Sequence, residues 1–102
     1  MTMVWVLLHP KMTPEHLGLI PGFLDEDDPA PAKEQFNRHY IAGWGAFTGF
    51  TFNKDNSISY PGDPTMPPLA MCQFRDELIL FYDHAWVAIK QKDGSVEICR
   101  MD

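Results

Sequence analysis

The chain has 102 residues, with a hydrophobic share of 45% and a charged share of 22%, which are ordinary values for a soluble globular protein. Nine prolines argue against an all-helical bundle, because proline is costly inside helices. Eight Lys and Arg against fourteen Asp and Glu give a formal net charge of −6, which disfavours nucleic acid as a partner. We expect one small domain over residues 1–102, in which 1–11 is a candidate N-terminal extension because Met12 is an alternative start.

The N-terminal part predicts a short strand followed by two helices. Residues 4–8 (Val-Trp-Val-Leu-Leu) are β-prone and predict a short buried strand. Residues 13–15 (Thr-Pro-Glu) are typical of a helix start, and Pro-Gly at 21–22 ends that helix early. A second helix is predicted over about 31–42, and the acids at 25–28 favour its N-terminus because carboxylates satisfy free amides there.

The middle of the chain changes to an apolar period of two. Phe50 and Phe52 predict a strand, and Lys-Asp-Asn at 54–56 turns it back toward Ile58 and Tyr60. Residues 61–68 (Pro-Gly-Asp-Pro-Thr-Met-Pro-Pro) hold four prolines and predict a loop of extended character. Residues 69–74 alternate weakly and suit either a strand or one short helical turn.

The C-terminal third predicts an antiparallel meander. Residues 78–82 and 85–91 read as strands, and Asp93-Gly94 is the strongest hairpin signal in the chain. We expect a two-residue turn there, with a positive φ at Gly94, and a returning strand near 96–101. The predicted fold is therefore α+β: two short N-terminal helices packed on one face of an antiparallel β-meander whose outer face is polar.

No residue pattern predicts catalysis, a cofactor or a metal. Two cysteines and four histidines lack the spacing of metal ligands, and the four acids at 25–28 suit a solvated helix start better than a cation site. Asn53, Asp55 and Ser57 open like a calcium loop, but the required glycine and glutamate are missing. The Asp83-His84 pair has no nucleophile motif beside it. We expect the chain to fold without a metal or cofactor.

The aromatic side chains are the strongest candidates for function. Tryptophan and tyrosine contribute much contact area at little entropic cost, so they are enriched in binding hot spots. We predict a binding surface at the helix-to-sheet corner and the adjoining proline-rich segment, made of Trp44, Phe47, Tyr60, Pro64 and Pro67. The alternative is that the aromatic residues form the core and the segment merely covers it.

Several segments resemble small uncharacterised proteins of tailed-phage and prophage genomes. The segments are Tyr-Pro-Gly-Asp-Pro at 60–64, Phe-Arg-Asp-Glu at 74–77, Ala-Trp-Val-Ala-Ile at 85–89, Asp-Gly-Ser at 93–95 and Thr-Pro-Glu-His-Leu-Gly at 13–18. The resemblance implies an accessory protein of a virus or mobile element, and it carries over no activity, cofactor or catalytic residue.

These observations favour a non-enzymatic accessory protein that binds another protein or itself. No targeting or membrane-spanning pattern stands out, so we expect a cytoplasmic location and neither membrane nor nucleic acid as partner. The alternative is a small enzyme or ligand-binding domain with a pocket between the helices and the sheet. An acidic mimic of DNA ranks lowest, because the meander carries Lys90, Lys92 and Arg100.

Overall fold

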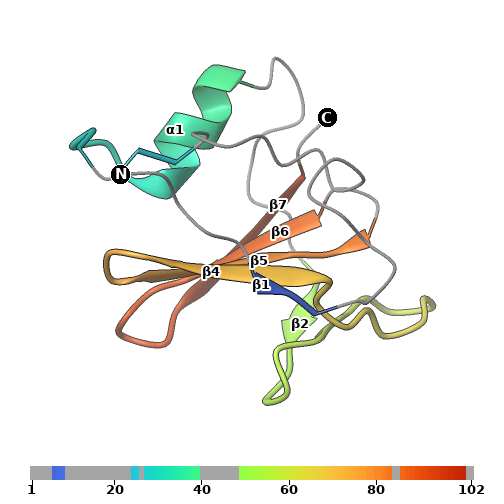
Figure 1. The fold of residues 1–102 in the computed structure, drawn as a ribbon. Coiled ribbons are helices and arrows are strands. Elements are labelled where there is room, and N and C mark those ends of the chain that lie inside the picture. Colours follow the sequence, from blue (N-terminus) through green and yellow to red (C-terminus); the bar gives the residue numbers. More distant parts are fainter. Residues whose placement is uncertain (1–5, 9–23, 26, 40–48, 84–85, 101–102) are drawn as a thin grey trace.

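The computed structural model describes residues 6–8, 24–25, 27–39, 49–83 and 86–100 (Figure 1). In this part the chain forms seven strands and one helix: β1 Val6–Leu7, α1 Ala32–His39, β2 Thr51–Phe52, β3 Ile58–Ser59, β4 Ala70–Phe74, β5 Glu77–Phe81, β6 Trp86–Lys90 and β7 Val96–Arg100. A five-stranded antiparallel sheet has the order β1-β4-β5-β6-β7, and β2 and β3 form a separate hairpin. Figure 1 shows α1 on one side of the large sheet and the small hairpin on the other.

The predicted α+β fold of two helices on a meander is wrong. The described residues contain one short helix among seven strands, so the fold is mainly β. The first expected helix, from residue 13, lies outside the described residues, as does the end of the second beyond residue 39. The meander itself is confirmed as β5, β6 and β7, and residues 69–74 resolve as strand β4.

Helix α1 covers one face of the sheet. Side chains alternate between the two faces along a strand, so every second residue of β4, β5 and β6 points toward the helix. The buried cluster on this side consists of Leu24, Ala32, Phe36, Ala70, Phe74, Ile79, Phe81, Val87 and Ile89. Phe36 is fully buried in this cluster and is the main apolar contact that holds the helix on the sheet.

The opposite face of the sheet is apolar and covered, which corrects the predicted polar outer face. Residues 78–82 read Leu-Ile-Leu-Phe-Tyr, and such an unbroken apolar run is typical of a strand that is buried on both faces. Leu80 and Tyr82 on this side are completely buried beneath Ile58 of β3. The β2–β3 hairpin therefore covers a face that the sequence predicted to be polar and exposed to water.

Edge strand β1 is also less buried than the sequence predicted. Of the strand expected at 4–8, Val6 and Leu7 form a two-residue strand that pairs with β4, through Val6 with Met71 and Leu7 with Ala70, and residues 4 and 5 lie outside the described residues. Val6 is 53% exposed, because β1 lies at the edge of the sheet and has only β4 beside it among the described strands.

Helix α1 begins against a carboxylate that comes from the sheet. The backbone N–H of Ala32 donates to Oε1 of Glu77 at 3.1 Å, and the side chain of Gln91 donates to Oε2 at 2.9 Å. The acidic run contributes before the helix instead, where Asp28 accepts the N–H of Ala30 at 3.0 Å. The expected local cap is thus replaced at Ala32 by a residue 45 positions away.

The segment before the helix is tied down by two side chains. Arg75, in the β4–β5 turn, donates to the carbonyl of Ala30 at 2.9 Å and to that of Asp28. Gln35 of α1 donates to the same Ala30 carbonyl at 2.9 Å, while its Oε1 accepts the N–H of Asp25 at 2.8 Å. These bonds satisfy carbonyls that no regular element would otherwise pair.

The β6–β7 turn has three residues between its closing pair, which corrects the predicted two-residue turn. The N–H of Gln91 donates to the carbonyl of Ser95 at 2.8 Å, and the N–H of Gly94 donates back to the carbonyl of Gln91 at 3.0 Å. A three-residue hairpin loop of this kind combines a turn with a left-handed residue at its end. The positive φ predicted for Gly94 is confirmed at 91°.

We expect Gly94→Val to destabilise the fold by about 1 kcal/mol or more, because a β-branched residue strains at this φ. The space around the position is open, so the effect would report backbone strain and not a clash. Chemical denaturation measures it, with Lys92→Ala in the same turn as the control. An unchanged midpoint for Gly94→Val would contradict the turn geometry.

We expect Glu77→Leu to lower the free energy of unfolding by about 1–3 kcal/mol, because it leaves the Ala32 amide and the Gln91 side chain without their acceptor. Glu77→Gln keeps one acceptor oxygen and should lose less. Circular dichroism during denaturation would follow both variants. Equal stability of Glu77→Leu and the wild type would show that the sheet does not cap the helix.

Candidate functional site

The five residues predicted to form the binding surface divide into two groups. Tyr60, Pro64 and Pro67 are described and exposed, and all three belong to the connection between β3 and β4. Trp44 and Phe47 lie outside the described residues. The described part of the candidate site therefore consists of Tyr60 and residues 61–68, which we call the proline loop.

The proline loop is held at both ends. At its start the N–H of Asp63 donates to the carbonyl of Tyr60 at 3.0 Å, in a turn where Gly62 has a φ of 89°. Near its end Met66 pairs with Ile58 through two backbone hydrogen bonds of 2.9 and 2.8 Å. The Met66 side chain also packs against the cluster beneath the hairpin. The loop thus returns alongside β3 and is fixed to the core.

Tyr60 stands at the exposed end of a row of three rings, which we call the aromatic row. Its ring centroid lies 5.0 Å from that of Phe50, and Phe50 lies 4.8 Å from Trp86 of β6. Both pairs are tilted, in the range where aromatic contacts are favourable. The Arg100 guanidinium covers Trp86 at 5.5 Å. A Cβ on Gly49 would lie 2.9 Å from the Tyr60 ring, so glycine allows this close approach.

A buried tyrosine anchors the hairpin that carries the site. The Tyr82 hydroxyl donates to the carbonyl of Asn56 at 2.5 Å, in the β2–β3 turn where Asn56 has a φ of 69°. Burial raises the pKa of Tyr82, with a smaller contribution from the charge of Asp55. The Lys90 ammonium lies 5.6 Å from the Phe52 ring on the same side. Sequence reasoning missed this anchor, since nothing local links Tyr82 to a turn 26 residues earlier.

Edge strand β1 adds apolar surface next to the proline loop. Val6, Leu8 and Tyr60 are the large hydrophobic side chains that remain exposed among the described residues, at 53%, 42% and 41%. The N–H of Leu8 donates to the carbonyl of Leu69 at 2.7 Å, directly after the proline loop ends. The apolar surface of β1 thus borders the loop.

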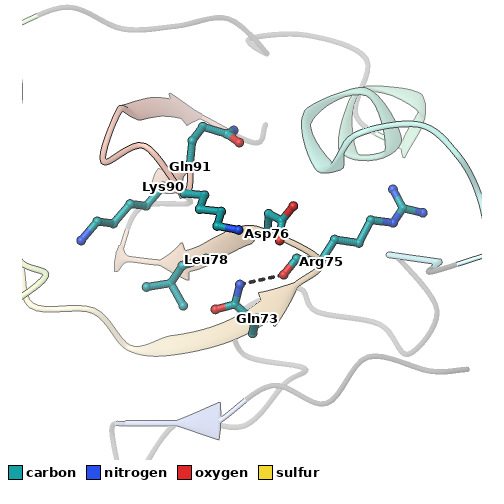
Figure 2. Close-up of a pocket in the computed structure, with 7 residues that line it drawn as sticks. Gln73, Arg75, Asp76, Leu78, Lys90 and Gln91 are labelled. Carbon is teal, nitrogen blue, oxygen red and sulfur yellow. Dashed lines mark hydrogen bonds between the residues drawn. The ribbon is translucent and has the colours of Figure 1, made fainter.

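One pocket among the described residues lies at the β4–β5 and β6–β7 turns, away from the position expected between helix and sheet. It has a volume of about 330 Å³ and is lined by Gln73, Arg75, Asp76, Leu78, Lys90, Gln91 and Lys92. Figure 2 shows the Arg75 guanidinium extending away from the other lining side chains, and it donates to the loop before α1. Gln73 is engaged with the carbonyls of Arg75 and Glu77 at 2.9 and 3.1 Å. The lining of this pocket contains no hydroxyl or thiol nucleophile.

Both cysteines lie in the described part of the chain, and both are buried. Cys72 and Cys99 are buried thiols that are not joined in a disulfide. Burial raises the pKa of Cys99 to about 11, and the negative charge of Glu97 adds a smaller rise. A thiol with this pKa is protonated at neutral pH and is a poor nucleophile. No group of three His, Cys, Asp or Glu side chains in this part of the chain is placed to hold a metal ion. His84 of the Asp83-His84 pair lies outside the described residues.

We expect stability to fall at alkaline pH because the pKa of Cys99 rises from its ordinary value of 9.0 to about 11 on folding. The folded state favours the protonated thiol, so this contribution is complete below the unfolded pKa and is lost as pH rises through the folded one. Denaturation midpoints should stay constant to about pH 8.5 and fall above it. Cys99→Ala should flatten the fall, and an identical decline in that variant would exclude Cys99 as its source.

Comparisons with protein-family models, with curated proteins and with solved structures found no match to this chain. None of the helices that the structure describes is long and apolar enough to cross a membrane. The geometry of Tyr60 and the proline loop is therefore what bears on function.

Proposed function

We propose that the chain is a non-enzymatic accessory protein that binds another protein, or a second copy of itself, through Tyr60 and the proline loop. The observation that carries this proposal is an exposed aromatic ring and exposed prolines on a segment that is pinned at both ends. The resemblance to phage and prophage proteins is in keeping with an accessory role, although it carries over no activity of its own.

The geometry favours binding because little conformational freedom remains to be lost. Tyr60 is supported by Phe50, and the loop is fixed by the pairing of Met66 with Ile58. Ordering side chains and loops at an interface costs roughly 0.5–1.5 kcal/mol per immobilised side chain, and a surface that is already ordered avoids much of this cost. Tyr60 also offers a ring face and a hydroxyl, which suits a partially wet interface.

The alternative of a small enzyme or ligand-binding domain has less support from the pocket at the strand turns. The cavity at Gln73 and Leu78 is lined by amides, lysines and one carboxylate, which supply no activated nucleophile. Binding through the exposed ring and loop is therefore the better-supported function.

We expect Tyr60→Ser to abolish or strongly reduce partner recovery while leaving the fold intact, because it removes the exposed ring from the surface. The immobilised chain would be incubated with a lysate of a bacterial host, and the bound proteins would be quantified by mass spectrometry. Light scattering on the purified chain would test self-association in parallel. Asn37→Ser is the matched control, since Asn37 is exposed on α1 across the sheet from the loop.

The proposal predicts a specific protein, or a dimer, that is kept by Asn37→Ser and lost in Tyr60→Ser. Recovery or self-association that Tyr60→Ser leaves unchanged would contradict this surface. A wild-type chain that stays monomeric and retains no protein above the bead background would contradict a binding function altogether. Thermal melting of both variants ensures that losses are not caused by unfolding.

A further inference from the structure

The prolines of the loop follow a spacing that matches a polyproline II helix. Pro61, Pro64 and Pro67 are three residues apart, and a polyproline II helix has three residues per turn. All three side chains are exposed. The turn at Gly62, with its φ of 89°, separates Pro61 from the rest, which leaves residues 64–67 as the stretch with this spacing.

This segment is restricted to extended backbone at almost every position. Proline fixes φ near the polyproline II value at Pro64 and Pro67, and Pro68 follows directly. A residue before proline avoids the helical region, which restricts Met66 as well. Only Thr65 is neither a proline nor followed by one, and its neighbour Met66 is held against Ile58.

The segment also presents hydrogen-bond acceptors outward. Met66 uses both its N–H and its carbonyl to pair with Ile58. In a planar trans peptide the carbonyl lies opposite the N–H, so the carbonyl of Thr65 points away from Ile58, which accepts the Met66 N–H. Proline has no N–H, and the exposed edge is therefore rich in acceptors and in apolar rings. Proline-binding domains recognise this combination with aromatic grooves that also donate hydrogen bonds.

We propose that residues 64–67 are a preformed proline ligand, read in the polyproline II conformation by a partner protein with an aromatic-lined groove. This inference rests on the proposed binding function and names the chemistry of the partner. The negative charge of the chain also restricts the partner. Asp63 adjoins the segment, and the formal net charge of the chain is −6, so the surface around the partner's groove should be positively charged. A groove bordered by Lys or Arg complements both.

The test uses a decaproline peptide as a competitor in the lysate capture described above. Decaproline adopts polyproline II in water and would occupy an aromatic groove of this type. We expect it to reduce recovery of the captured protein about tenfold at saturation, and a scrambled Gly-Ser peptide of equal length to have no effect. The double variant Pro64→Ala/Pro67→Ala should cause a similar loss without competitor.

Pro29→Ala is the matched control, because Pro29 is an exposed proline in the segment before α1. It should bind as the wild type does. Capture that is lost in Tyr60→Ser but insensitive to decaproline and to the double proline variant would overturn the inference and leave the proposed function standing. Absence of any captured protein would overturn both. Melting curves of the double variant exclude unfolding as the cause of a loss.

Discussion

Strand β5 must be covered on both faces, and the rest of the architecture follows from this constraint. Its side chains Ile79 and Leu80 point to opposite sides of the sheet and are both completely buried. A small sheet with two apolar faces needs two covering layers. Burying one large apolar side chain contributes about 1.5–3 kcal/mol to the free energy of unfolding, and an exposed side chain does not make this contribution. Helix α1 supplies one layer and the β2–β3 hairpin supplies the other.

Polar anchors decide how each covering layer sits. On the helix side Glu77 accepts the first helical N–H, and Arg75 binds carbonyls of the preceding segment. On the hairpin side the Tyr82 hydroxyl reaches the carbonyl of Asn56. Apolar contacts are non-directional, so these hydrogen bonds are what select one orientation of helix and hairpin over others. The groups that orient the two layers thus lie at the two ends of β5. Glu77 is its first residue, and Tyr82 follows its last residue.

The candidate binding surface is a consequence of the hairpin layer. Ile58 and Met66 face the sheet and hold the proline loop against the core, while Pro64 and Pro67 are left on the outside. Tyr60 sits between these two roles, with its ring supported by Phe50 and still partly exposed. A loop that covers the core can therefore also bind a partner, because Met66 packs toward the core while Pro64 and Pro67 remain exposed.

The sequence by itself determined the local elements of the described part. The period of two predicted the 50–60 hairpin, and the segments at 78–82 and 85–91 predicted meander strands. Proline and acids predicted the start of α1, and Asp93-Gly94 predicted a hairpin with a positive φ at Gly94. Tyr60, Pro64 and Pro67 are exposed, and the binding surface that they were expected to form stays a prediction. These features depend on residues that are close in the chain, where backbone sterics and side-chain alternation act directly.

Only the tertiary structure decided which partner each element found. The covering of the second sheet face, the pairing of β1 with β4 and the helix cap from Glu77 all join residues that are far apart in the chain. The aromatic row likewise brings Trp86 of β6 beside Phe50. The apolar run at 78–82 contained a signal of burial on both faces, but it could not show what would cover them. Alternation specifies that a face is apolar, whereas the element that covers it is selected by the packing of the whole chain.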